Sequence, residues 1–165
     1  MGIQFHNPNI TNSMRLEQKV FQKFTRGAKT LGLAESCTGG LISNLFTDMA
    51  GSSQFFTLGI IAYANCAKTK ILKVSPILLK KHGAVSSPVA AAMARGVRQI
   101  LKTDYGLSVT GIAGPGGGSK NKPVGLVFIA LSCPQKTIVR KFLFKGSRKA
   151  IKKQAAQTAL KMLAK

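Results

Sequence analysis

The sequence is poor in residues on which several classes of protein depend. It has no Trp, two Tyr, two His and four acidic residues, against 25 Lys and Arg in a chain of 165 residues. So few aromatic residues argue against a surface that stacks the bases of single-stranded nucleic acid. The few Cys, His and acids also lack the spacing of metal ligands. We therefore expect no specific nucleic acid partner and no bound metal.

The three cysteines, Cys37, Cys66 and Cys133, are odd in number and have no C-x-x-C spacing. Such cysteines are typical of reduced thiols in a cytoplasmic protein. Apolar runs such as "VGLVFIALS" are too short to span a bilayer, and the N-terminus has no apolar segment of a secretory signal. We expect a cytoplasmic protein that makes no use of a membrane.

Positive charge is the unusual feature of the composition. The formal net charge is +21, and the basic residues run from Arg15 to Lys165 without forming one arm. This balance favours acidic partners, either nucleic acid or phosphorylated metabolites. The alternative is that the lysines form a solvated surface with no partner.

The length and the 45% of hydrophobic residues fit one domain with its own core. We expect a flexible tail over residues 1–12 and a single domain over residues 13–165. Helices that alternate with strands early, and an antiparallel pair late, predict a three-layer α/β/α sandwich with a mixed sheet. Ser13, Ser87 and Ser147 are expected to cap helices. The expected helices cover 13–28, 38–50, 67–74, 78–81, 86–101 and 146–164, and the expected strands cover 30–36, 56–64, 105–114, 124–132 and 137–144.

Three loops should meet at one edge of this sheet, because ligands of open α/β sheets bind at the carboxyl ends of the strands. They are "ESCTGG" after the first strand, "AYANCAK" after the second and "GIAGPGGGS" after the third. The start of the last helix, "KGSRKA", is expected to join them.

The loop "ESCTGG" has two interpretations. A hydroxyl at a strand-to-helix turn lies where backbone amides and the helix dipole stabilise a developing negative charge, which suits a nucleophile. Alternatively, Thr38 caps the helix and Ser36 only fills a turn. Cys37 is intrinsically the better nucleophile, but a cysteine needs a histidine base. Neither His6, in the expected tail, nor His82, beside two lysines, suits that role.

A lysine with a lowered pKa is the remaining way to activate a serine. Lys68 is the candidate, since it follows the second strand and is expected near the first loop. Tyr63 at the end of that strand is placed to orient the reacting groups or relay a proton. The alternative is that Lys68 is one of many surface lysines.

Two other motifs bear on phosphate binding. The loop "GPGGGSKN" has the order S-K and not the G-K-[ST] of the phosphate-binding loop of a nucleoside triphosphatase, so it is not such a loop. In "KGSRKA", Arg148 and Lys149 place positive charge at the positive end of a helix, a local cost that makes sense if they hold a phosphate monoester. A tolerated surface charge explains the same pattern.

Several ordered blocks resemble a known family. They are "AESCTGG", "DMAGSSQFF", "GIIAYANCAK", "HGAVSSPV", "SVTGIAGPGGGSKNKPVGLV" and "RKAIKKQAAQTAL". Over about residues 14–164 the chain is similar to the C-terminal domain of the competence/damage-inducible protein CinA, which also occurs alone as nicotinamide-nucleotide amidase. The additional N-terminal domain of CinA has no counterpart here, so we expect the stand-alone form.

The resemblance implies an amidohydrolase that converts nicotinamide mononucleotide and water to nicotinate mononucleotide and ammonia, without metal or cofactor. It implies Ser36 as nucleophile, Lys68 as general base and Tyr63 as proton relay, so Ser36 is preferred to Cys37. Backbone amides of Thr38, Gly39 and Gly40 are the expected oxyanion donors. Candidate substrate-binding positions are Thr38, Gly39, Ser53, Thr110, Gly111 and Arg148.

One departure from the family pattern is "GSR" in place of "GDR", which removes an acid beside Arg148. A homo-oligomer is expected, as is common for a small enzyme. The alternative function is a non-catalytic module that binds a nucleotide or serves DNA uptake or repair.

Overall fold

The computed structural model describes residues 14–165, so the expected tail over 1–12 and the expected cap at Ser13 lie outside the described residues. Five strands form one sheet in the order β2-β1-β3-β4-β5. Strand β1 pairs in parallel with β2 and β3, whereas β3, β4 and β5 pair antiparallel. The strands are β1 (Leu31–Glu35), β2 (Phe56–Ile61), β3 (Tyr105–Gly111), β4 (Leu126–Ser132) and β5 (Thr137–Leu143).

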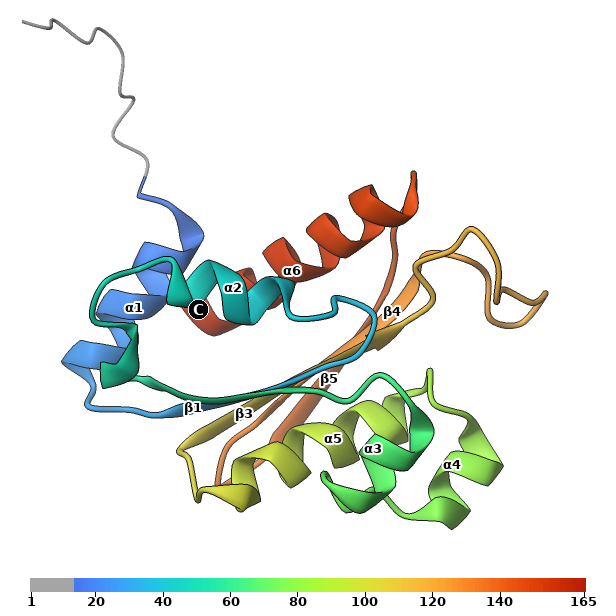
Figure 1. Cartoon of the computed structure of the whole chain (residues 1–165), viewed down its shortest axis with the longest axis horizontal. Helices are drawn as coiled ribbons and strands as arrows, with labels where there is room; N and C mark the ends of the chain where they lie inside the picture. Colours follow the sequence, from blue (N-terminus) through green and yellow to red (C-terminus); the bar gives the residue numbers. More distant parts are fainter. Residues whose placement is uncertain (1–13) are drawn as a thin grey trace, which may run out of the picture.

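Helices cover both faces of this sheet, which confirms the three-layer α/β/α prediction (Figure 1). On one face lie α1 (Leu16–Arg26), α2 (Leu41–Thr47) and α6 (Arg148–Ala164). On the other lie α3 (Asn65–Lys70), α4 (Pro76–His82) and α5 (Ser87–Ile100). A short 3-10 helix, η1 (Ser52–Gln54), precedes β2.

The burial of each strand follows from its place in the sheet. Strand β1 lies between β2 and β3 and has helices on both faces, so all five of its residues are buried. Strand β2 is at the edge and alternates between half-buried and exposed residues. The apolar run at residues 31–34 therefore marks an interior strand, as expected for parallel strands covered on both sides.

Most helix starts differ from the prediction. Helices α1, α3 and α4 begin at Leu16, Asn65 and Pro76, where the expected ranges begin at 13, 67 and 78. Helix α2 begins at Leu41 and not near Thr38, because Gly39 and Gly40 have φ of 62° and 92°, outside the helical region. The cap of α5 is Ser86 and not Ser87, and the Ser86 hydroxyl donates to the carbonyl of Gly83 over 2.9 Å. The start of α6 is as predicted, since the Ser147 hydroxyl accepts from the amide of Ala150 at 3.3 Å.

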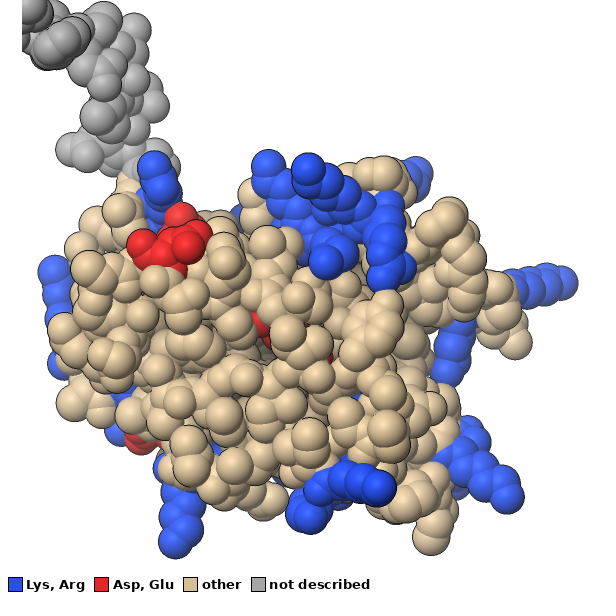
Figure 2. Space-filling view, in the orientation of Figure 1, with Lys and Arg blue, Asp and Glu red and all other residues tan. Residues whose placement is uncertain are grey.

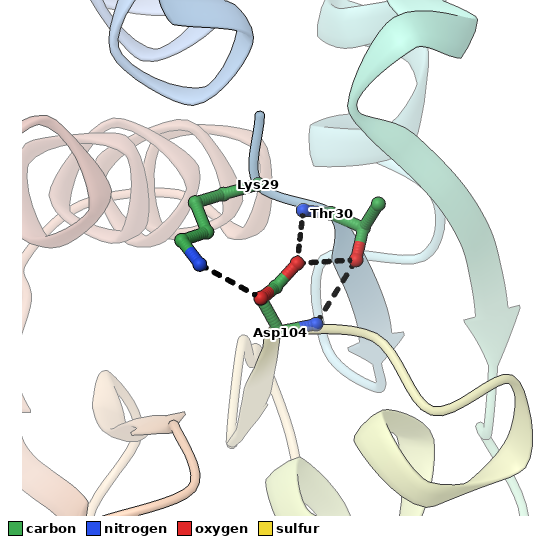
Figure 3. A network of polar contacts seen from close by, with 3 residues as sticks. All are labelled: Lys29, Thr30 and Asp104. Carbon is green, nitrogen blue, oxygen red and sulfur yellow. Dashed lines mark hydrogen bonds and ion pairs between the residues drawn. The ribbon is translucent and has the colours of Figure 1, made fainter. Parts of the chain in front are cut away.

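A polar cluster joins the amino ends of β1 and β3 (Figure 3). Asp104 accepts from the amide and the hydroxyl of Thr30, both at 2.9 Å, and from Lys29 Nζ at 3.1 Å. Partial burial alone would raise the pKa of Asp104, but the bonds from Thr30 and the charge of Lys29 together lower it. The cluster fixes the end of the sheet that lies away from the three loops.

Candidate active site

The three loops and the start of α6 meet at the carboxyl ends of the parallel strands, as the sequence predicts. They enclose a cavity of about 180 Å³. Its lining includes the loop residues that the sequence singles out, namely Ser36, Cys37, Tyr63, Lys68, Thr110, Gly111 and Arg148.

Ser36 and Lys68 are in direct contact inside this cavity. Lys68 Nζ lies 3.2 Å from Ser36 Oγ, and it donates to the carbonyls of Ala62 at 2.7 Å and Tyr63 at 3.0 Å. These two carbonyls hold two of the amine protons. When the amine is neutral, its remaining lone pair faces the Ser36 hydroxyl and can accept its proton.

Burial prepares Lys68 for the neutral form. The residue is 1% exposed although it is a lysine, because the short helix α3 brings it under the end of β1. This burial lowers the pKa of Lys68, and it outweighs the opposite influence of the Cys37 and Cys66 thiols. Lys68 is thus not one of the surface lysines.

Burial has the opposite effect on the reactivity of Cys37. Its side chain is buried in the core under α2 and α6, and burial raises its pKa to about 12. The nearby charge of Glu35 acts in the same direction. A thiol in this environment stays protonated at neutral pH and is a poor nucleophile.

Glu35 organises the turn that carries both residues. Its buried carboxylate accepts from the amides of Gly40, Ile42 and Ser43, at 3.1, 3.2 and 2.8 Å, and from the Ser43 hydroxyl at 2.7 Å. The carboxylate therefore takes the place of a side-chain cap at the N-terminus of α2. The sequence interpretation of Thr38 as that cap is wrong. The Thr38 hydroxyl is buried and has no hydrogen-bond partner among residues 14–165.

Two of the three expected oxyanion donors are already engaged. The amide of Gly39 donates to the carbonyl of Ser36 at 3.1 Å, and the amide of Gly40 donates to Glu35. Within the described chain, the Thr38 amide has no hydrogen-bond partner. Thr38 is fully buried, however, and it is not among the residues that line the cavity, so the structure does not bring this candidate substrate-binding residue to the cavity surface.

Tyr63 and Arg148 close the mouth of the cavity together. Arg148 donates to Tyr63 Oη at 2.8 Å and to the carbonyl of Gly114 at 2.7 Å. The Tyr63 hydroxyl is hydrogen-bonded to Arg148. Tyr63 is hydrogen-bonded to Lys68 through its backbone carbonyl and not through its hydroxyl. Both side chains are exposed, which places a guanidinium charge at the opening.

The remaining candidates divide into two groups. Thr110 and Gly111, at the end of β3, line the cavity, and the Thr110 hydroxyl donates to the carbonyl of Ala84 at 3.0 Å. Gly39 is exposed on the turn beside Lys152 and does not line the cavity. Ser53 is exposed in η1, just before β2, which is the opposite end of the sheet from Ser36. The structure does not bring Ser53 together with the other candidates.

Sequence reasoning missed Glu35, Asn65 and the pair Ala84–Val85. Glu35 precedes Ser36 at the end of a buried strand, a place where an acid needs a partner, and that signal was present in the sequence. Asn65 begins α3, two residues after Tyr63, and lines the cavity. Ala84 and Val85 enter the lining only through packing of the segment after α4, which no local pattern reveals.

Within residues 14–165, no three His, Cys, Asp or Glu side chains gather in a way that would hold a metal ion. None of the helices in this part of the chain combines the length and the hydropathy needed to cross a membrane.

A comparison with protein families matches residues 13–165 to the CinA C-terminal domain. The chain belongs to the CinA family. CinA-like proteins of Syntrophus aciditrophicus and Desulfotalea psychrophila are 49% and 50% identical to it, each over 90% of this chain. The match covers 36% of each of those proteins, so the chain spans about a third of the length of these curated relatives.

Solved structures of the CinA family have the same fold. A competence/damage inducible protein, CihA, from Agrobacterium tumefaciens has a TM-score of 0.86 and 37% identity, over 92% of this chain and 96% of that one. A CinA superfamily protein from Enterobacter cloacae has a TM-score of 0.88 and 29% identity, over 98% and 97% of the two chains. The mixed sheet with helices on both faces is therefore the architecture of the family.

Proposed function

We propose that this domain is an amidohydrolase that converts nicotinamide mononucleotide and water to nicotinate mononucleotide and ammonia. The observation that carries the proposal is the contact of 3.2 Å between Lys68 Nζ and Ser36 Oγ in a buried site. A serine with a buried amine as its base needs neither histidine nor metal. The choice of substrate rests on the resemblance to nicotinamide-nucleotide amidases.

The reaction begins when Ser36 Oγ attacks the carboxamide carbon and its proton passes to the neutral amine of Lys68. The oxyanion that forms needs an N–H donor, and we assign this role to the amide of Thr38, which donates no hydrogen bond within residues 14–165. The carbon–nitrogen bond then breaks, and Lys68 gives its proton to the leaving amine, which departs as ammonia. The nucleotide remains as an ester on Ser36. A water molecule, losing its proton to Lys68, attacks this ester, and the proton returns to Ser36 Oγ as the acid leaves.

Two features of the cavity support a mononucleotide as substrate. Its volume of about 180 Å³ is below the roughly 300–1,000 Å³ of pockets that enclose a whole drug-sized ligand. It therefore fits the pyridine carboxamide and leaves the ribose and phosphate at the opening. Arg148 stands at that opening and donates two hydrogen bonds within residues 14–165, which leaves N–H groups for phosphate oxygens.

The test is ammonia release from nicotinamide mononucleotide by the purified protein, with EDTA present throughout. We expect turnover to continue in EDTA, with nicotinate mononucleotide formed in equal amount to ammonia. If the protein binds the nucleotide, as calorimetry would show, but releases no ammonia, the proposal is wrong and a nucleotide-binding module remains.

A further inference from the structure

A second and larger hollow lies on the face of the molecule that carries α1, α2 and α6. Its volume is about 830 Å³, within the range of sites that hold one small molecule. Apolar side chains from all three helices form its floor: Leu16, Leu41, Leu45, Ala156 and Leu160. We call this hollow the α6 groove. It borders the candidate active site, because Arg148 lines both.

Positive charge surrounds the α6 groove. Its lining holds five cations, Arg15, Arg148, Lys149, Lys152 and Lys153, and one acid, Glu17. Figure 2 shows Lys and Arg side chains crowded over α6 on this face. Lys29 and Asp104 form the single ion pair found among the described residues. None of these five cations therefore forms an ion pair with an acid in this part of the chain. An unneutralised cluster of this kind attracts a ligand with several negative charges.

The position of four of these cations narrows the chemical class of the ligand further. They occupy the first six residues of α6, at 148, 149, 152 and 153, and the first turn of that helix contains no acid. The spacing places them on one side of the helix, where the positive end of the dipole adds to their charge. Several phosphates linked within one ligand match such a cluster better than a single carboxylate does.

The following turns of α6 offer a different surface. Ala156 and Leu160 continue the apolar floor, and Gln157 and Glu17 supply an amide and a carboxylate at its side. A flat apolar group with an exocyclic amine fits this part, since the amine can donate to Glu17 or Gln157. Among residues 14–165, those that line the groove include no aromatic side chain, which argues against a surface that stacks the bases of single-stranded nucleic acid.

We propose that the α6 groove binds a nucleoside polyphosphate, with the phosphates on the cations at the start of α6 and the base on the apolar floor beside Gln157 and Glu17. This site is separate from the proposed amidase reaction and does not depend on it. An occupant of the groove and a substrate in the cavity would both contact Arg148.

The experiment is isothermal titration of the whole protein with ATP, in EDTA and about 0.15 M salt, which screens long-range attraction. We expect saturable binding, with AMP and inorganic triphosphate each weaker by about tenfold or more, because one lacks the extra phosphates and the other lacks the base. The double variant Lys149→Ala/Lys153→Ala should weaken ATP binding by about tenfold or more.

The matched control is Lys161→Ala/Lys165→Ala. It removes the same charge from the carboxyl end of the same helix, outside the groove, and ATP should bind as in the wild type. Equal weakening in both double variants would mean general attraction to a basic surface and would overturn the proposal. So would the absence of ATP binding, triphosphate binding as tight as ATP, or tighter binding of dodecyl phosphate, which would point to an acyl ligand.

Discussion

Ser36 and Cys37 are neighbours in the chain, but they lie in different surroundings. Ser36 Oγ faces a buried amine at 3.2 Å, whereas the Cys37 thiol lies in the core, where burial raises its pKa to about 12. The preference for Ser36 thus has a physical basis at the scale of single residues. Sequence alone left it to the resemblance, because both residues are reactive types and the contrast between them comes from burial.

Lys68 gives a prediction that does not depend on any reaction. Because burial lowers its pKa in the folded state, the unfolded chain binds a proton there more strongly. The cost of burying the ammonium is fully present below the folded pKa and is lost as pH rises toward the ordinary lysine value.

We therefore expect the stability of Lys68→Met relative to the wild type to fall as pH rises from neutral toward that value. The measurement is urea unfolding of both proteins across this range. Lys70→Met, on the exposed side of the same helix, is the control and should show no such trend. A difference for Lys68→Met that does not change with pH would contradict the buried-amine interpretation.

At the scale of elements, the strands were the most predictable part. Strand β1 was recognised from a continuous apolar run, and the pair β4–β5 from two runs separated by "CPQK". The start of α2 is not predictable in this way, because the Glu35 carboxylate that replaces a side-chain cap lies in the preceding strand and not at the start of the helix itself. Side-chain capping rules consider nearby hydroxyls, so they favoured Thr38.

Glu35 also gives a prediction at this scale. In Glu35→Gln, an amide NH₂ group would face backbone amides of α2 that now donate to the carboxylate. We expect a loss of about 1–3 kcal/mol in the free energy of unfolding, the usual cost of unmet buried polar groups. Chemical denaturation measures this loss directly.

Glu17→Gln is the matched comparison for that experiment. Glu17 is the acid in the first turn of α1, and no hydrogen bond of its side chain is found in the described chain. Its removal should cost about 0.3–1 kcal/mol, the value of a charge near a helix N-terminus. Equal effects of the two substitutions would show that Glu35 has no special part in the turn.

At the scale of the whole molecule, the three layers and the mixed sheet followed from the order of elements, but the strand order β2-β1-β3-β4-β5 and the α6 groove did not. The groove combines residues of α1, α2 and α6, which lie far apart in the sequence. The basic pairs at 148–149 and 152–153 were visible in the sequence. Their position above an apolar floor depends on how three helices pack, and no single pattern encodes that.

The net charge of +21 predicts how stability depends on salt. Repulsion among like charges destabilises the compact state, and salt screens it. Between low salt and about 0.15 M sodium chloride we expect the melting temperature to rise by about 2–4 °C, the shift that about 1 kcal/mol produces in a chain of this size. Calorimetry at several salt concentrations measures it. A melting temperature that stays constant or falls would mean that the charges are already neutralised.

The central claim is that Ser36, activated by Lys68, attacks a carboxamide. The most direct measurement is the rate of ammonia release from nicotinamide mononucleotide by the wild type, Ser36→Ala and Cys37→Ala, with binding of the nucleotide checked in each. We expect Ser36→Ala to bind the nucleotide but to lose turnover by at least about 10³-fold, on the scale seen when a nucleophile is removed, and Cys37→Ala to retain turnover. Activity that survives in Ser36→Ala, or that disappears only in Cys37→Ala, would contradict the claim.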